Sequence, residues 1–327
     1  MEYAPFIVPT LCRYEHFKRL IESLQVNPEA KFTDLFIALD YPAKSSHWDG
    51  YRKISNYVDT ITGFKQVHVV RREHNYGVSN NIKDIIDFVS EHYKAYIFSE
   101  DDNFFSPNFL AFINHGLEKF KDDPTVYSIN GYRHFYDIKY DDNNYFFENV
   151  DFSAWGYGVW VERYNKFRSE MTYLFVLRAF LNPVKFHRII TAGWQKVLDF
   201  FNVLLRFKRP GSTDSIISLY LAITGKNCVV PTISKVRNEG WDETGNSFDG
   251  KDVPLDLAAK HLNQEIDNES SFDFHGDGHN YYDYNKKIFV AQNYMGINFG
   301  KFISKFFAMM IRKIIHFSQM LFGKRKF

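Results

Sequence analysis

Three consecutive carboxylates, Glu100, Asp101 and Asp102, follow directly on the apolar run AYIFS at 95–99. Adjacent acidic side chains repel one another and resist burial, so such a cluster needs either open water or a cation. Carboxylates this close together can serve one divalent cation and one polar group of a ligand, and Mg²⁺ or Mn²⁺ prefers such hard oxygen ligands. Taken alone, the triplet is equally compatible with a solvated acidic loop, so the surrounding chain must decide.

Strands and helices alternate around this triplet over the first 132 residues. Strands are predicted at 4–11, 33–40, 66–73, 95–99 and 125–132, and helices at 13–24, 80–93 and 106–120. Ser106 and Pro107 are expected as the cap and first position of the last of these helices. This alternation implies βαβ units in an α/β protein with a mostly parallel sheet, whose ligands bind outside the carboxyl ends of the strands. The triplet is therefore expected at the ligand-binding edge.

Composition limits the class of protein. A chain of 327 residues with 45% hydrophobic residues can bury a large core, and its length suits one catalytic domain with an appendage. The two cysteines, Cys12 and Cys228, lack CxxC spacing, which argues against structural zinc and fits a reducing compartment. The start MEYAPFIVPTL has neither the basic region nor the long apolar stretch of a signal peptide. We therefore expect a cytoplasmic protein.

Charge is distributed unevenly along the chain. Residues 161–210 carry ten Lys and Arg against three Asp and Glu, and residues 301–327 carry seven against none, although the net charge is only +1. Such a separation of charge along a chain usually indicates that the basic segments bind a partner, rather than that the fold requires them. The aromatic, basic segment 161–210 could hold the diphosphate of a lipid-linked acceptor near a membrane surface. No nucleic-acid-binding motif accompanies these charges, so nucleic acid is not expected as a partner.

The C-terminal segment 300–327 is expected to form a basic amphipathic helix. One face carries seven apolar residues and Lys301, Lys305 and Arg312 lie opposite; the apolar residues are Ile303, Phe306, Phe307, Met310, Ile314, Phe317 and Leu321. Its uncharged stretches are too short to span a bilayer. Such a helix is typical of an interfacial anchor on an anionic membrane, and the alternative is packing against the core or a partner subunit.

Several blocks in a fixed order carry a resemblance to a known family. They are NYGVSNN at 75–81, YIFSEDDNFFSPNF at 96–109, DFSAWGYGVWVERY at 151–164, and the segment 213–247 from TDSIISLY to RNEGWDETGNS. Over about residues 4–247 the chain resembles GT-A fold glycosyltransferases, and is most similar to those related to N-acetylglucosaminyltransferase I and to bacterial surface-polysaccharide transferases. The last 80 residues take no part in the match.

The resemblance implies an organisation for the whole chain. It implies a Rossmann-like, mixed and mostly parallel sheet flanked by helices over residues 1–250, with a helical C-terminal extension. The nucleotide-sugar-binding half would span about 1–132 and the acceptor-binding half 133–250. Residues 251–299 would be an irregular linker before the helix at 300–327.

The resemblance also implies a role for individual residues. The acidic triplet corresponds to the family's DXD motif, in which Asp102 would coordinate Mn²⁺ or Mg²⁺ while Glu100 and Asp101 lie around the ribose or behind the metal ligand. The remaining donor-site residues would be Pro9, Thr10 and Arg13 at the base, Asp40 at the uracil edge, and Arg71, His74, Asn75 and Asn80 at the ribose and diphosphate, with Gly77 allowing close backbone approach. For Arg71, an ordinary surface arginine is the alternative.

The implied reaction is metal-dependent transfer of a hexosyl or N-acetylhexosaminyl group from a nucleotide-sugar, with UDP favoured. The acceptor would be a hydroxyl of a glycan or lipid-linked saccharide in bacterial-type surface polysaccharide or glycoconjugate synthesis. Attack on an anomeric carbon requires a base, and Asp214 matches the family's catalytic Asp, giving inversion by single displacement. The alternative is that Asp214, or Ser212 before it, only caps a helix.

Two further segments are expected around the sugar. Trp155 would stack on the sugar and Gly156 would leave room for it, although Trp155 could equally be a core residue. The segment 237–247 is rich in turn formers and is expected to close over the donor as a flexible loop. It has Asn246 and Ser247 where many bacterial relatives have a His, which puts a metal or phosphate role of those positions in doubt.

Two rival functions are weighed against the transferase. A sugar nucleotidyltransferase should have a Gly-rich phosphate loop near residue 15, whereas CRYEHFKRL at 12–20 has no glycine. A non-catalytic carbohydrate-binding or partner-binding protein of the same fold should have lost the metal carboxylate or the base, whereas Asp102 and Asp214 are both present. The sequence therefore favours the enzyme.

Overall fold

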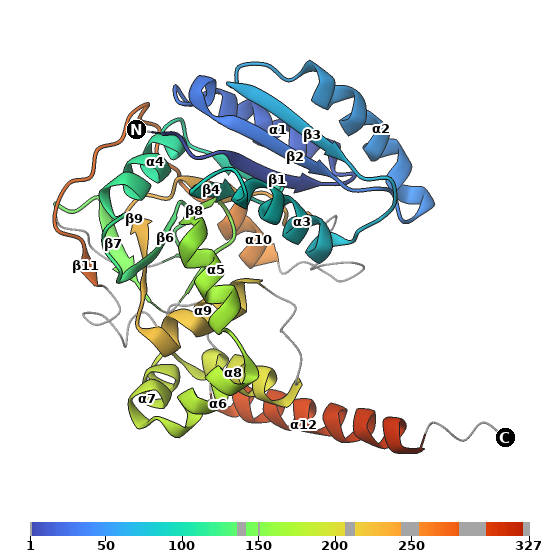
Figure 1. The fold of residues 1–327 in the computed structure, drawn as a ribbon, viewed down its shortest axis with the longest axis vertical. Coiled ribbons are helices and arrows are strands. Elements are labelled where there is room, and N and C mark those ends of the chain that lie inside the picture. Colours follow the sequence, from blue (N-terminus) through green and yellow to red (C-terminus); the bar gives the residue numbers. More distant parts are fainter. Residues whose placement is uncertain are drawn as a thin grey trace.

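A nine-stranded mixed sheet runs through the molecule (Figure 1). The computed structural model describes residues 2–135, 142–149, 151–206, 213–242, 255–280 and 299–322. Within these ranges the strand order is β11-β7-β9-β6-β8-β4-β1-β2-β3. The strands are β1 (Phe6–Thr10), β2 (Asp34–Leu39), β3 (Gln66–Arg71), β4 (Ala95–Phe98), β6 (Val126–Asn130), β7 (Tyr145–Glu148), β8 (Tyr157–Trp160), β9 (Asn227–Pro231) and β11 (His279–Asn280).

The strands β3, β2, β1 and β4 form a wholly parallel half of this sheet. Every residue of β2 is buried, which explains its nearly continuous apolar sequence after Asp34. The helices of this half are α1 (Tyr14–Gln25), α2 (Trp48–Tyr57), α3 (Val78–Ser90) and α4 (Phe109–Lys119). Side chains of α1, α2 and α4 join one hydrophobic core and those of α3 join another. The two cores therefore lie on opposite faces, and the parallel strands end together at one edge.

The strand β8 lies antiparallel to both of its neighbours, β4 and β6, in the middle of the sheet. It lies in the DFSAWGYGVW block, and it joins the first and second parts of the chain into one sheet. A separate two-stranded sheet pairs β5 (Asn103–Phe105) with β10 (Val236–Asn238), and Asn103 lies opposite Asn238. This pairing brings the segment after β10 to the acidic triplet.

The helices of the second part form a layer at the far end of the molecule, which we call the helical lobe (Figure 1). It consists of α6 (Tyr173–Leu181), α7 (Pro183–Thr191), α8 (Trp194–Arg206) and α12 (Phe299–Phe322), and it is joined to the sheet by α5 (Val161–Glu170) and α9 (Thr213–Thr224). Thr172 caps α6 by accepting a hydrogen bond from the Phe175 backbone N–H. Asn182 caps α7 in the same way, with Pro183 at the first helical position.

The fold class predicted from the sequence is confirmed, because the sheet is mixed, mostly parallel and flanked by helices, with a helix at the C-terminal end. The predicted strands and helices of the first 132 residues are all present, with ends shifted by a few residues. The expected start of α4 at Ser106 and Pro107 is wrong. Asn108 stands at the helix start and receives a hydrogen bond from the Ser106 hydroxyl, so α4 begins two residues later than Pro107.

The expected irregular linker at 251–299 needs correction where the structure describes it. Residues Leu255–Leu262 form α10, whose His261 is fully buried. Phe272 is buried against Phe112 of α4, with ring centroids 4.9 Å apart. This stretch belongs to the packed domain because its aromatic side chains complete the core. The division into halves at residue 132 stays a prediction.

The helix expected at 300–327 is confirmed as α12, while residues 323–327 lie outside the described part of the chain. Its apolar face is divided. Phe302 is buried and Phe306 partly buried against Trp194 and Phe201 of α8, whereas Phe307 is 60% exposed. Part of α12 therefore packs on its own domain, which is the alternative that the sequence left open. No helix in the described ranges is both long and apolar enough to cross a membrane.

Candidate functional site

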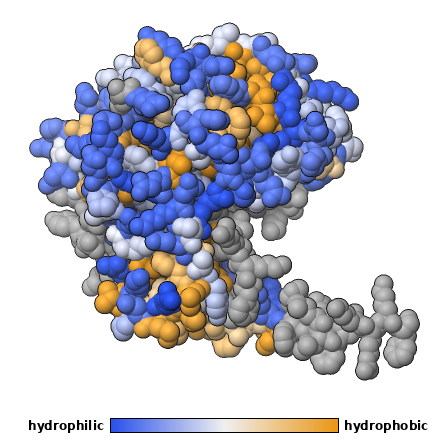
Figure 2. All heavy atoms as spheres, in the orientation of Figure 1, coloured by the Kyte–Doolittle hydropathy of each residue, from blue (hydrophilic) through white to orange (hydrophobic). Residues whose placement is uncertain are grey.

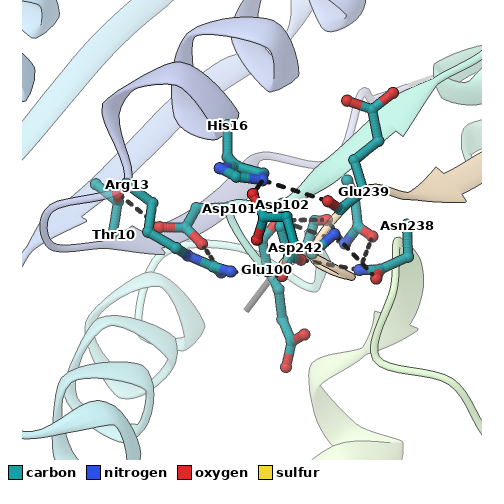
Figure 3. A network of polar contacts seen from close by, with 12 residues as sticks. Thr10, Arg13, His16, Glu100, Asp101, Asp102, Asn238, Glu239 and Asp242 are labelled. Atoms are coloured by element: carbon teal, nitrogen blue, oxygen red, sulfur yellow. Dashed lines mark hydrogen bonds and ion pairs between the residues drawn. The ribbon is translucent and has the colours of Figure 1, made fainter. Parts of the chain in front are cut away.

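The acidic triplet lies at the carboxyl end of β4, beside the connection between β1 and α1 (Figure 3). Asp101 accepts a hydrogen bond from Thr10 Oγ1 at 2.8 Å and forms an ion pair with Arg13. The same guanidinium reaches Asp102, with 2.9 Å between Arg13 Nη1 and Asp102 Oδ2. Both aspartates are more than nine-tenths buried. Arg13 therefore supplies the cation that two adjacent buried carboxylates require.

The second oxygen of Asp102 is held by the strand β10. Asn238 Nδ2 donates to Asp102 Oδ1 at 2.9 Å, and the Glu239 backbone N–H donates to the Asp102 carbonyl at 2.8 Å. A Cβ at Gly240 would lie 2.0 Å from Asp102 Oδ2, so only glycine allows the chain to pass this carboxylate. Burial raises the pKa of Asp102, and the charge of Arg13 opposes that rise.

The start of the predicted donor loop is tied to α1. His16 is buried, and its Nε2 lies 3.0 Å from Asp242 Oδ2 and 3.3 Å from the Glu239 carbonyl. The Glu239 carboxylate also pairs with Arg19 at 2.8 Å and with Arg237 at 2.8 Å. Residues 243–247, including Asn246 and Ser247, lie outside the described part. The described part of the loop is thus folded back over the carboxylates.

Glu100 faces a different group of side chains from its two neighbours. Trp155 Nε1 donates to Glu100 Oε2 at 3.1 Å, and the Trp155 ring meets Tyr132 edge-on with centroids 4.7 Å apart. His261 of α10 joins this cluster and stacks on Trp241, with centroids 4.0 Å apart. Burial, together with the charges of Asp102 and Asp214, raises the pKa of Glu100 to about 8. Trp155 itself is half-buried.

Asp214 lies in the first turn of α9 and is brought to the same site. It is half-buried, and its charge adds to the effect of burial in raising the pKa values of the Glu100 carboxyl group and the Tyr157 hydroxyl group, so its carboxylate lies within electrostatic range of both. Burial raises the pKa of Asp214 to about 6, and a hydrogen bond from the Ala154 backbone and the charge of Lys196 oppose that rise. Ser212 lies outside the described residues.

Lys196 supports Asp214 from the helical lobe. It is buried on α8 and pairs with Asp151 at 2.6 Å. Burial works against its charge, but the carboxylates of Asp151 and Asp199 raise the pKa of Lys196 above its usual value. Lys196 therefore stays protonated, and its positive charge acts on the Asp214 carboxylate from a helix outside the sheet.

Asp40 organises a second polar group at the ends of β1 and β2. Its Oδ1 accepts hydrogen bonds from the Tyr41 and Tyr76 backbone N–H groups, both at 2.8 Å, and Asn75 Nδ2 lies 3.4 Å from its Oδ2. Asn80 donates to the Tyr76 carbonyl at 3.0 Å. Gly77 has φ +72 just before α3, a conformation that favours glycine. Asp40 thereby holds the 75–77 turn at the strand edge.

Other predicted site residues make different contacts. Arg71 is paired with Asp59 at 2.7 Å near the surface, as the surface-arginine alternative expects. The His74 ring is exposed and meets Tyr76, with centroids 4.8 Å apart. Pro9 lies within β1, opposite Ala38. Gly156 has φ +74, and a Cβ there would lie 2.9 Å from Phe109 and from Val236, so close packing alone requires glycine.

The residues present fit a divalent cation only in part. Within the described ranges, no group of three or more His, Cys, Asp and Glu side chains could hold a metal ion. Asp102 offers a buried carboxylate, but both of its oxygens are engaged by Arg13 and Asn238. Asp102 would therefore hold a cation with most of its remaining ligands supplied by a bound phosphate or water, as is common for Mg²⁺.

Sequence reasoning missed four side chains around the carboxylates. They are His16, Asn238, Glu239 and Lys196. A signal for His16 existed, because it lies in the first turn of the helix that follows β1 at the ligand-binding edge. Asn238 and Glu239 lie within the segment 237–247 that the sequence marks as a donor loop, and Lys196 lies within the basic segment 161–210, but no local pattern singles out these three residues.

Comparisons with known proteins give only distant structural likenesses. No family model matches the chain, and no curated protein matches it. Among solved structures, the mannosyltransferase PcManGT from Pyrobaculum calidifontis, in complex with GDP-Man and Mn²⁺, is similar at 10% identity and TM-score 0.34, over 48% of this chain and 44% of that one. S. aureus TarS is similar at 13% identity and TM-score 0.30, over 43% and 24% of the two chains. TarS 1–349 is similar at 12% identity and TM-score 0.33, over 50% and 49%. Each alignment spans less than half of the solved chain.

Proposed function

We propose that this chain is a metal-dependent, GT-A type glycosyltransferase that moves a sugar from a nucleotide-sugar, UDP-linked by preference, to a hydroxyl group. The observation that carries the proposal is the meeting of two sets of carboxylates. Asp101 and Asp102 follow β4, Asp214 lies at the start of α9, and the charges of all three act on Glu100. Such a site, at the carboxyl edge of a mostly parallel sheet, offers a metal ligand and a base to one substrate.

The donor would bind across the ends of β1, β2 and β4. Asp40 and the turn that it holds, with Asn75, lie where the uracil and ribose would fit, and Thr10 and Arg13 lie between them and the triplet. Trp155 and Glu100 would contact the transferred sugar, since an aromatic face packs against sugar C–H groups and a carboxyl group binds its hydroxyls.

Asp102 would hold Mn²⁺ or Mg²⁺, shared with the donor diphosphate. When bound, that ion supplies positive charge that stabilises the departing nucleoside diphosphate. His16 and Asn238 would keep Asp102 and the 239–242 segment in place. The cation would share with Arg13 the balancing of the negative charge on the carboxylates and the diphosphate.

Asp214 would act as the general base. The acceptor oxygen attacks the anomeric carbon, the bond from that carbon to the diphosphate oxygen breaks, and the diphosphate leaves with the electron pair. The proton of the acceptor hydroxyl passes to the Asp214 carboxylate, which is mostly ionised at neutral pH because its pKa is about 6. A single displacement of this kind inverts the anomeric configuration.

The acceptor would be a glycan or lipid-linked saccharide in the synthesis of surface polysaccharide or glycoconjugate. The transferred group would be a hexosyl or N-acetylhexosaminyl group. The protein would act in the cytoplasm, peripherally at the inner face of the membrane, with the segment 300–327 in contact with anionic lipid. Supporting this, the exposed part of α12 carries Phe307, Ile311 and Lys305.

The test is nucleoside diphosphate release from a panel of nucleotide-sugars with Mn²⁺. Donor-dependent release is expected from the wild type, with metal-dependent donor binding lost in Asp102→Asn and retained in Asp214→Asn. Asp49→Asn is a matched control, because Asp49 is an exposed carboxylate on α2. No release with any donor, together with unchanged donor binding in Asp102→Asn, would refute the transferase. Pyrophosphate release from a nucleoside triphosphate and a sugar phosphate would favour the nucleotidyltransferase instead.

A further inference from the structure

Large apolar side chains are exposed on the helical lobe. Ten of the seventeen exposed large hydrophobic residues in the described part of the chain belong to α6, α7 and α12. Figure 2 shows apolar surface gathered at this end of the molecule, while the opposite end is mostly hydrophilic. On α6 and α7 the residues are Tyr173, Leu174, Phe180, Leu181, Val184 and Ile190. An exposed apolar patch of this kind marks a contact surface.

The two segments that carry this surface contain basic residues and no acidic ones. Neither 171–198 nor 299–322 contains a single Asp or Glu, although the whole chain has 39. Arg178 and Arg188 are exposed on α6 and α7, and Lys185 lies over the Phe175 ring at 5.5 Å. On α12, Lys301, Lys305 and Arg312 are exposed. Exposed apolar side chains next to Lys and Arg residues complement an anionic lipid surface. Such a surface offers hydrocarbon and negative charge together.

The corner between α6 and α7 is built to hold apolar side chains outward. Leu181 is 72% exposed and Val184 is 63% exposed, one on each side of Asn182 and Pro183. Asn182 Oδ1 accepts hydrogen bonds from the Val184 and Lys185 backbone N–H groups, both at 3.1 Å. Pro183 lacks an N–H and restricts its own φ. Because these backbone donors are satisfied and the corner is rigid, it can leave water at little cost in hydrogen bonds or conformational entropy.

The corner and α12 are connected through α8. Phe201 of α8 lies between the two, with its ring centroid 6.5 Å from that of Phe180 on α6 and 5.2 Å from that of Phe306 on α12. The side of α12 that faces away from α8 exposes Phe307, Ile311 and Ile314. The two exposed apolar surfaces therefore belong to one packed unit, and α12 is only a part of it.

We propose that the α6–α7 corner inserts into the interface of an anionic bilayer, and that the exposed side of α12 extends this contact. The membrane-binding element is then the helical lobe, rather than an independent C-terminal helix. Insertion of Leu181 and Val184 supplies the hydrophobic part of the binding, and Arg178 and Arg188 supply the electrostatic part. This proposal does not depend on the transferase function of the carboxylate site.

Vesicle cosedimentation of the full chain tests the corner. The wild type is expected to bind phosphatidylcholine vesicles with 30% phosphatidylglycerol at least about tenfold more tightly than pure phosphatidylcholine vesicles, and less tightly in 0.5 M NaCl. The double variant Leu181→Glu/Val184→Glu should bind the mixed vesicles at least about tenfold more weakly. Val26→Glu/Phe32→Glu is the matched control, because these exposed residues, 62% and 48%, lie on the parallel half; its binding should stay within about twofold.

A site-specific signal distinguishes insertion from loose adsorption. In a Cys12→Ser background, an environment-sensitive fluorophore on Val184→Cys should shift to shorter wavelength with mixed vesicles, and one on Val26→Cys should not. Unchanged binding of the Leu181→Glu/Val184→Glu variant, or absence of any vesicle binding by the wild type, would overturn the proposal. It would also fall if the wild type were a dimer in lipid-free solution that this variant dissociates, since the surface would then be covered by a second copy. Nucleoside diphosphate release is expected to survive these substitutions, so failure here leaves the proposed function untouched.

Discussion

The carboxyl edge of the parallel strands and the helical lobe differ in how their energetically unfavourable side chains are accommodated. The edge gives its buried carboxylates polar partners, whereas the lobe leaves apolar side chains exposed. At the edge, buried Asp101 and Asp102 are compensated by Thr10, Arg13 and Asn238. In the lobe, ten large apolar side chains on α6, α7 and α12 are left exposed without a covering element in the described part of the chain. The buried carboxylates of the edge have their partners within the chain. The exposed apolar side chains of the lobe would be removed from water only by contact with another molecule or surface.

This difference shows what each region can bind. A compensated buried charge cluster accepts a ligand that brings its own compensation, such as a cation together with a phosphate. An exposed apolar surface accepts any apolar environment, and the absence of acidic residues directs it toward negative charge. The lobe nevertheless contributes to the edge, because Lys196 of α8 stands behind Asp214.

The largest effect is expected at Asp214. Asp214→Asn should lower turnover by about 10²- to 10⁴-fold while donor affinity changes little, because the carboxylate would act only as a proton acceptor. Steady-state turnover and donor binding by calorimetry measure the two. Burial raises the folded-state pKa of Asp214 to about 6 from its usual value of 3.8, so its ionised form is disfavoured by folding. The melting temperature of Asp214→Asn at pH 7.5 should therefore not fall, and a large fall with unchanged turnover would assign Asp214 to helix capping.

The next effect concerns the cation at the edge. Arg13→Gln leaves Asp101 and Asp102 without their counter-ion, which should cost about 3 kcal/mol in the free energy of unfolding without metal. Urea titration measures the loss, and 5 mM Mn²⁺ should restore more stability to Arg13→Gln than to the wild type. Arg71→Gln is the control, since its exposed pair with Asp59 is worth at most about 1 kcal/mol. If both substitutions lowered the free energy of unfolding equally, Arg13 would be no more important to stability than an exposed surface arginine.

A matched pair of phenylalanines on α12 tests the divided helix. Phe302→Ala should destabilise the lobe by about 3 kcal/mol, because its buried ring leaves a cavity against Trp194. Phe307→Ala, where the ring is 60% exposed, should change stability by less than about 0.5 kcal/mol and instead weaken vesicle binding. Thermal unfolding and cosedimentation separate the two. The reverse pattern would mean that the outward side of α12 is the one packed on the protein.

The smallest effect is the pH dependence of turnover. Because a base must be ionised and the pKa of Asp214 is raised to about 6, turnover should fall about tenfold for each pH unit below 6 and level off above it. Lys196→Met removes the positive charge that opposes the rise in the Asp214 pKa, so the midpoint should move to higher pH. A profile of turnover against pH from 4.5 to 8.5 measures both variants. An unchanged midpoint in Lys196→Met would show that the lobe does not tune the base.

Much of the architecture could be predicted because its signals are local. The apolar runs that became β1, β2 and β4 and the helical spacing of α1 and α3 depend on neighbouring residues, so their types and approximate bounds were predicted. The antiparallel strand β8, the packing of α10 and the late start of α4 were not, since each depends on a distant partner. Asn108, for example, is engaged by Asp267 and Ser271, about 160 positions away along the chain.

By itself, the sequence determined that the acidic triplet follows a buried strand, that Asp214 begins a helix, and that 171–198 and 299–322 lack acidic residues. Only the tertiary structure decided that Arg13 pairs with Asp102 and Asn238 donates a hydrogen bond to it, that the charge of Asp214 acts on Glu100, and that α12 buries one side and exposes the other. The physical reason is the same in each case. Residue type and spacing fix local conformation and charge, whereas the partner of a buried charge or apolar face is selected by packing across the whole chain.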